Sequence, residues 1–576
     1  MSKQTFYLGL SMAGAVSAGA YTAGFMDYIL EALSEWENAK KEQANNPDSN
    51  IPKHNVIIDA IGGASAGGMV GMISTLAMCS ENWTPVKKVS NVKTGNILYD
   101  SWVFLDDDMD LSNGSNASKT TFEKMLETSD IEEKGAPSLL NSKPIDNIAE
   151  RVFNDLPTDA SISKLPNYIS KDFRLLITLT SLRPLGYNLK MSRLQSKFLD
   201  ETPGHHVNSH DIVAHFKLNY NETEDKGKYL PFQPHEKLSR DFLAKVTKAT
   251  GAFPLGLQSR YFDAEFSSDY LNYSLRARKS FNTEMDVVIN PEETSKFQFT
   301  AIDGGTINNE PFDEVLRHLI SKHGEPDKKN PKYGTILIDP FPNFFEEKIT
   351  TQPNYNISSI MGVLGGLVPT ILNQARNKQN DTYDVGLFKL ISFPRKLKPG
   401  AKELRDHPPL ATGGVGGFGG FLDVKFRQHD FFLGRDNARN FLRGFLFLEY
   451  DKEDPNNLFH GVSDNALKSF QRKIEQDDGS EKIYMPIIPD INKLNGDTNP
   501  SKYEVDDFPK FNTEAFKKLE KPIKNRVKAI LKAELKGKIG NWWLRQGISL
   551  FRGRISKNIA KWAMEHIEAD FKERKM

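Results

Sequence analysis

A serine flanked by glycines is the residue of this 576-residue chain whose setting most directly suggests catalysis. It is the centre of Gly63-Ala64-Ser65-Ala66-Gly67, a G-x-S-x-G sequence between a predicted strand over 56–61 and a predicted helix. Gly63 and Gly67 would permit a sharp turn that projects the Ser65 hydroxyl beside the helix N-terminus, where negative charge is favoured. The motif alone is equally compatible with a glycine-rich helix start, so the rest of the chain has to supply the other catalytic groups.

A serine hydroxyl is a weak nucleophile, so it needs a base that removes its proton. Asp303 is the candidate base, because it ends an apolar strand over 297–302 and is followed by Gly304 and Gly305. The two glycines would let the backbone pass close to the site. Asp-Gly-Gly is by itself also a common turn sequence, so this motif too depends on its context.

The charge that develops on a carbonyl oxygen during acyl transfer needs hydrogen-bond donors. Candidate donors are the backbone amides of Gly14, Ala15 and Val16, in a loop of small residues over 11–19, together with the amide of Ala66. Taken alone, this loop could equally cradle a nucleotide phosphate. The spacing of its glycines fits neither G-x-G-x-x-G nor a P-loop, which favours an oxyanion hole.

The elements that must position these groups alternate between strand and helix. Apolar strands over 5–10 and 56–61 are each followed by a helix, the first over 21–36. This order predicts an α/β domain, with a parallel sheet and helices on its faces. The sheet is expected to resume over 175–180, 212–218, 297–302 and 335–338.

The small-residue loop, the G-x-S-x-G sequence and the later Asp-Gly-Gly, in this order, resemble the patatin-like phospholipase family. Thr247–Leu257 resembles the end of a helix in that family, and Asp303–Pro311 resembles its Asp-Gly-Gly followed by Asn and Pro. The resemblance implies a patatin-like three-layer α/β fold with a mostly parallel central sheet. It also implies a Ser65/Asp303 dyad without histidine, which hydrolyses fatty acyl esters of lipids as a phospholipase A or lysophospholipase and needs no cofactor.

The resemblance covers about residues 5–340, except for much of 80–170, and leaves the C-terminal region without a counterpart. We expect a catalytic domain over 1–345 with a polar insertion at about 80–170. A mostly helical C-terminal region over 346–576 would follow. It contains a glycine-rich segment over 413–420, interpreted as a flexible turn, and a basic amphipathic tail from about 515.

Two other functions are compatible with these residues. The family usually has consecutive glycines and a cation in the small-residue loop, whereas this chain has Ala15, Val16 and Ala18 at those positions. A catalytically impaired lipid-binding or scaffold protein on the same fold is therefore one alternative. The other is an α/β-hydrolase esterase with a Ser-Asp-His triad, for which the available histidines are His318, His323, His407 and His429.

The composition narrows the range of partners. Basic and acidic residues balance at 75 each, so the overall charge does not indicate nucleic-acid binding. Cys79 is the only cysteine, which excludes an intramolecular disulfide and favours a cytoplasmic location. Four histidines lack a recognised metal-ligand spacing, so we expect no metal site and interpret their segment as a polar loop entering a strand: His205, His206, His210 and His215.

The C-terminal tail is the most basic part of the chain. Between residues 515 and 576, seventeen Lys or Arg stand against six acidic residues. An apolar face of a predicted helix, with tryptophans among the cations further along, fits peripheral docking on a lipid membrane. A helix packed on the core with a solvated basic face is the other interpretation of this tail, and the sequence favours it slightly.

Overall fold

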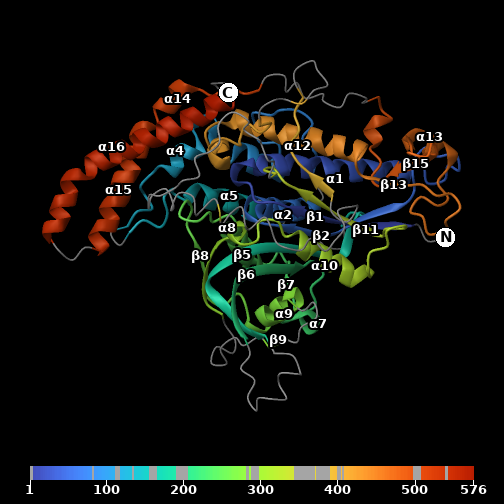
Figure 1. Ribbon diagram of the computed structural model, residues 1–576, viewed down its shortest axis with the longest axis horizontal. Coiled ribbons are helices and arrows are strands. Elements are labelled where there is room, and N and C mark those ends of the chain that lie inside the picture. Colours follow the sequence, from blue (N-terminus) through green and yellow to red (C-terminus); the bar gives the residue numbers. More distant parts are fainter. Residues whose placement is uncertain are drawn as a thin grey trace, which may run out of the picture.

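A ten-stranded sheet forms the centre of the molecule (Figure 1). Its parallel part has the order β12-β11-β1-β2-β5 and consists of β1 Thr5–Met12, β2 Asn55–Gly63, β5 Ile169–Leu189, β11 Tyr333–Ile338 and β12 Leu390–Ser392. β1, β2 and β11 are largely buried, which explains their nearly continuous apolar sequences. The structure is a computed structural model, and it describes residues 4–80, 83–109, 117–132, 135–154, 165–189, 205–279, 285–286, 297–342, 370, 390–397, 404, 408–496, 508–538 and 542–576.

Antiparallel strands extend the sheet beyond β5. β10 (Phe299–Asp303) pairs with β5 and β8 (Arg260–Phe262), while β6 (His205–Lys217) forms a long hairpin with β5. The short strands β7 (Leu230–Pro231) and β9 (Met285–Asp286) complete this side. The predicted α/β fold with a mostly parallel central sheet is confirmed, and each strand expected from the sequence overlaps an observed one.

Helices cover both faces of the sheet, which gives three layers (Figure 1). α1 (Gly19–Glu42) and α2 (Ser65–Met78) lie on one face together with α8 (Lys237–Thr250). On the other face, α10 (Phe312–His323) packs Val315 and Leu319 in one cluster with residues of the central strands. Among the described helices, none has both the length and the apolar character needed to cross a bilayer.

The polar sequence before β5 contains more structure than its composition indicates. It forms α3 (Ile97–Tyr99), a π-helix η2 (Asp100–Phe104), α4 (Thr121–Met125) and α5 (Lys143–Asn154), with a small β3–β4 pair of Asp108–Met109 and Ala117–Lys119. α5 buries its apolar residues, including Ile148 and Val152. The limits of an insertion at about 80–170 stay a prediction.

The C-terminal region is joined to the sheet and to α1. β12 adds a strand at the edge, and α12 (Val424–Gly444) packs along α1. Arg435 of α12 forms buried ion pairs with Asp27 and Glu31 of α1. Residues after 345 thus add a strand to one edge of the sheet and a helix to α1, while the domain boundary at 345 stays a prediction.

The other C-terminal elements lie further from the centre. A three-stranded sheet has the order β13-β15-β14, formed by Phe447–Glu449, Glu481–Pro486 and Arg472–Glu475, and α13 (Asp464–Phe470) adjoins it. After α14 (Thr513–Lys517), the long helices α15 (Glu520–Lys538) and α16 (Trp542–Glu573) pack against each other and project to one side (Figure 1). The largely helical C-terminal region expected from the sequence is present. The described residues also form the helices α7 (Glu222–Asp225) and α9 (Ser268–Lys279) and the 3-10 helices η1 (Val16–Ala18), η5 (Gly304–Thr306) and η8 (Ile491–Lys493).

Candidate active site

Ser65 lies on a sharp turn between β2 and α2, as the G-x-S-x-G sequence predicts. Its backbone has φ +52°, a left-handed conformation that non-glycine residues rarely adopt. The turn requires the two flanking glycines: a Cβ on Gly63 would lie 2.4 Å from the Gly67 carbonyl oxygen, and a Cβ on Gly67 would lie 2.3 Å from that of Met12. The strain places the hydroxyl at the N-terminus of α2, where the helix dipole stabilises developing negative charge.

Asp303 meets Ser65 across the sheet. The Ser65 hydroxyl donates to Asp303 Oδ2 at 2.6 Å, although the two residues are 238 positions apart. The second carboxylate oxygen accepts the Gly305 amide at 2.7 Å, which fixes the orientation of the carboxyl group. Gly304 is needed where the chain crosses β5, since a Cβ there would lie 2.1 Å from the Thr178 carbonyl oxygen. This geometry suits transfer of the serine proton to a carboxylate.

Burial changes the acidity of the carboxyl group. Ser65 and Asp303 are 6% and 4% exposed. Desolvation raises the pKa of Asp303 from its ordinary 3.8 to about 7, while the hydrogen bonds from Ser65 and the Gly305 amide act in the opposite direction. A carboxyl group with this pKa can exchange a proton with a hydroxyl near neutral pH, as a general base has to do.

Thr250, at the end of α8, supports the turn in a way that sequence reasoning missed. Its hydroxyl accepts the Ser65 backbone amide at 2.9 Å. Two residues later, the Ala252 carbonyl accepts the Asp303 amide at 2.9 Å, so one short segment holds both members of the pair. The resemblance over Thr247–Leu257 was the signal that marked this segment, but it gave no role to an individual residue.

The proposed oxyanion donors need a correction at Gly14. Its amide already donates to the Asn309 carbonyl at 3.2 Å, so it is not free to bind an oxyanion. Val16 lines the pocket and has φ +48°, a strained value for a β-branched residue at a position where the family usually has glycine. Ala66 is the second residue of α2, whose first amides have no acceptor within the helix. Ala15, Val16 and Ala66 therefore stay as the predicted donors.

The glycine-rich segment over 413–420 holds the small-residue loop in place. The expected flexible turn is instead a pair of short 3-10 helices, η6 (Val415–Gly417) and η7 (Gly419–Phe421). The Ser17 hydroxyl donates to the Gly417 carbonyl and accepts the Gly420 amide at 3.0 Å. Glycine is required at 420, because a Cβ there would lie 2.5 Å from the Ser17 hydroxyl oxygen. The C-terminal region thus contacts the loop that carries the predicted donors.

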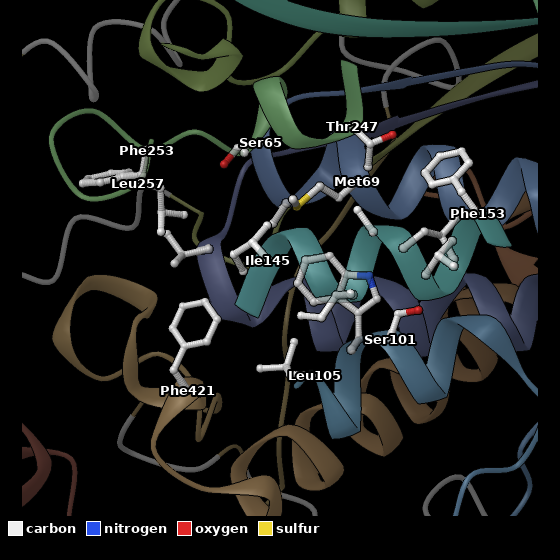
Figure 2. A pocket seen from close by; sticks show the side chains of 18 residues that line it. Ser65, Met69, Ser101, Leu105, Ile145, Phe153, Thr247, Phe253, Leu257 and Phe421 are labelled. Carbon is white, nitrogen blue, oxygen red and sulfur yellow. The ribbon is translucent and has the colours of Figure 1, made fainter. Parts of the chain in front are cut away.

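An apolar pocket extends from Ser65 (Figure 2). It encloses about 720 Å³, part of which is open to solvent. Figure 2 shows Phe153 and Ser101 on the side of the pocket remote from Ser65. No charged residue is among the described residues that line it: Val16, Ser65, Ala66, Met69, Ile73, Ser101, Trp102, Leu105, Ile145, Ile148, Ala149, Val152, Phe153, Thr247, Gly251, Phe253, Leu257 and Phe421.

The histidines of the alternative Ser-Asp-His triad that the structure describes contact carboxylates other than Asp303. His323 contacts Asp59 at 2.8 Å and His318 lies 3.6 Å from the same carboxylate. His429 contacts Asp430, and His407 lies outside the described residues. The earlier histidine cluster belongs to strand β6 rather than to a loop before it, and no three potential ligands come together as a metal site in the described ranges.

Comparisons with known proteins agree with the fold. Over 570 residues the chain is 28% identical to the uncharacterized protein y4iI of Sinorhizobium fredii, across 92% of this chain and 76% of that protein. A family model described as patatin-like phospholipase matches residues 10–316, more than half of the chain, and this range includes Ser65, Asp303 and the small-residue loop. The chain therefore belongs to the patatin-like phospholipase family, whose activity is directed at lipid esters.

Proposed function

We propose that this protein is a lipid acyl hydrolase of the phospholipase A or lysophospholipase type, with Ser65 as nucleophile and Asp303 as base. The observation that carries the proposal is the 2.6 Å hydrogen bond between the two side chains at the start of an apolar pocket. The family assignment supports hydrolysis of lipid esters in general. The pocket favours a long alkyl chain, because each buried methylene contributes about 0.8 kcal/mol.

The proposed reaction has two steps. Asp303 takes the proton of Ser65 while the serine oxygen attacks the acyl carbonyl carbon, and the amides of Ala15, Val16 and Ala66 stabilise the oxyanion. The protonated carboxyl then gives its proton to the leaving alcohol, which departs and leaves an acyl-serine. In the second step Asp303 takes a proton from water, the resulting hydroxide attacks the acyl group, and the fatty acid is released as Ser65 regains its proton.

A fluorophosphonate probe and a lipid substrate test this proposal together. Wild-type protein is expected to be labelled and to release fatty acid from phospholipid, whereas Ser65→Ala should do neither. Ser74→Ala is the matched control, since Ser74 is buried in the same helix α2 and does not line the pocket. Labelling that survives in Ser65→Ala would disprove the assignment. Failure of the wild-type protein to react would favour the impaired lipid-binding alternative.

We further propose that the protein is cytoplasmic and contacts membranes peripherally through its basic tail. Ile555, Ile559 and Trp562 of α16 recur at helical spacing and are 40%, 40% and 59% exposed. Exposed cations, including Lys557 and Lys561, lie beside them. Apolar side chains among cations fit the interface of an anionic bilayer. Trp562→Ser should weaken sedimentation with anionic vesicles, and unchanged sedimentation would contradict this role of the tail.

A further inference from the structure

A leucine is displayed to solvent on the loop that borders the pocket. Phe253 and Leu257 line the pocket, and Leu255, between them in the chain, is 76% exposed. Leu255 also has φ +64°, a conformation in which leucine is disfavoured and glycine or asparagine is tolerated. A strained backbone that exposes a large apolar side chain lowers stability, so its presence at the pocket points to a function.

A second exposed leucine lies beside the first. The Leu139 amide donates to the Leu255 carbonyl at 2.8 Å, and the Leu140 amide donates to the Gly256 carbonyl at 3.0 Å. Leu139 is 54% exposed. These hydrogen bonds hold the two leucines together at the edge of the pocket. We call Leu139 and Leu255 the leucine rim.

The rim is connected to the basic tail. Arg526 of α15 is almost completely buried and donates to the Leu139 carbonyl at 2.5 Å and to that of Ser138 at 3.1 Å. The same guanidinium group pairs with Asp130 at 2.8 Å. Arg526 thus fixes α15, the first long helix of the basic tail, to the segment that carries Leu139. Attraction of the tail to anionic headgroups would therefore also bring the rim to the lipid surface.

We propose that the leucine rim inserts into a lipid bilayer and sets the mouth of the pocket against it, so that a lipid enters the pocket directly from the membrane. The inference rests on the proposed lipid hydrolysis. A protein partner seated on the rim would cover the entrance to the pocket, whereas a bilayer supplies the molecule that enters. Phe253 and Leu257, two residues before and after Leu255 in the chain, belong to the apolar pocket wall (Figure 2).

The test compares membrane binding with hydrolysis of a soluble ester. The rim variant combines Leu139→Ser with Leu255→Asn, because asparagine tolerates the left-handed backbone at 255. Leu238→Ser is the matched control: Leu238 is 86% exposed in the first turn of α8, nine residues or about 14 Å from Thr247 of the pocket wall. Each protein is sedimented with vesicles of phosphatidylcholine and phosphatidylserine and assayed on a short-chain nitrophenyl ester.

The rim variant is expected to bind vesicles roughly ten- to one-hundredfold more weakly and to lose vesicle hydrolysis in proportion, since one or two leucine side chains no longer leave water. Hydrolysis of the soluble ester should stay within about twofold of wild type, and Leu238→Ser should match wild type in every assay. Vesicle binding by the rim variant at the wild-type level, or equal weakening by Leu238→Ser, would overturn the proposal. Absence of soluble-ester hydrolysis in the wild-type protein would instead contradict the proposed function.

Discussion

The acidity of Asp303 gives the sharpest prediction for the proposed reaction. Only the ionised carboxyl can accept the Ser65 proton, and burial raises the pKa of Asp303 to about 7. At pH 5, two pH units lower, about one carboxyl group in a hundred is ionised. The specificity constant, kcat/KM, for a soluble ester should therefore fall about one-hundredfold between pH 9 and pH 5, with a midpoint near 7.

The assay measures kcat/KM for a short-chain ester from pH 5 to pH 9, with circular dichroism at each pH to show that the protein stays folded. The rate of fluorophosphonate labelling should follow the same curve, because it depends on the same proton transfer. Activity that stays constant down to pH 5 would refute the reasoning. It would mean that the carboxyl group keeps an ordinary pKa in spite of its burial.

The raised pKa of Asp303 also predicts the direction in which the stability of the protein changes with pH. Between about pH 4 and pH 7 the folded protein keeps a proton on Asp303 that the unfolded chain has lost, so this carboxyl makes the fold less stable as pH rises. The shift from 3.8 to about 7 corresponds to at most about 4 kcal/mol. Asp303→Asn should therefore raise the melting temperature more at pH 8 than at pH 4. An equal effect at both pH values would contradict a raised pKa.

Three substitutions test the surroundings of the pair. Val16→Gly relieves the backbone strain at φ +48° and should raise the free energy of unfolding by about 1 kcal/mol in a denaturant titration. A lower free energy of unfolding would show that the contacts of the Val16 side chain stabilise the fold by more than the strain destabilises it. Thr250→Val removes the acceptor of the Ser65 amide and should lower kcat by about tenfold with KM little changed. An unaltered kcat would show that the turn at Ser65 keeps its geometry without this hydrogen bond. Ile148→Trp narrows the pocket and should lower hydrolysis of long-chain esters relative to short-chain esters, which a parallel loss for both would contradict.

Local signals in the sequence predict the two residues, Ser65 and Asp303, that the structure joins by a hydrogen bond. Ser65 was recognised because a sharp turn needs glycines at fixed positions, and the contacts of Gly63 and Gly67 show the physical cause. Asp303 was recognised because an apolar strand ends in a carboxylate followed by two glycines. Both are features of a few neighbouring residues, and the order of strands and helices then indicated that they lie on one sheet.

The pocket could not be read from the sequence in the same way. Its wall includes Ile148 and Val152 of α5 and Trp102 of the π-helix η2, all from the stretch that we interpreted as a polar insertion. A short helix with one apolar face gives a weak periodic signal among polar residues. The hydrogen bond from the Gly14 amide to the Asn309 carbonyl was also out of reach, because it joins backbone groups almost 300 positions apart.

Backbone strain is concentrated around the pocket. In the described part of the chain six non-glycine residues have a positive φ, and three of them, Val16, Ser65 and Leu105, line the pocket. Leu255 lies on the pocket loop, and Val415 begins η6, which packs on the loop that contains Val16; the sixth is Lys575, near the C-terminus. Each of these six backbone conformations destabilises the fold by about 1–3 kcal/mol, so their sum approaches the free energy of unfolding of a typical domain.

Such strain persists only where contacts from several elements hold the backbone. Thr250 holds Ser65, and the paired segment of Leu139 holds Leu255. Ser17, next to Val16, is held by Gly417 and Gly420 of the C-terminal region. That region in turn is fixed to α1 by the buried pairs of Arg435. Residues after 345 therefore stabilise the geometry of the predicted oxyanion loop. A substitution that weakens the packing of α12 should disturb this loop before it separates Ser65 from Asp303, because the hydrogen bond between those two residues is supported from α8 and β10.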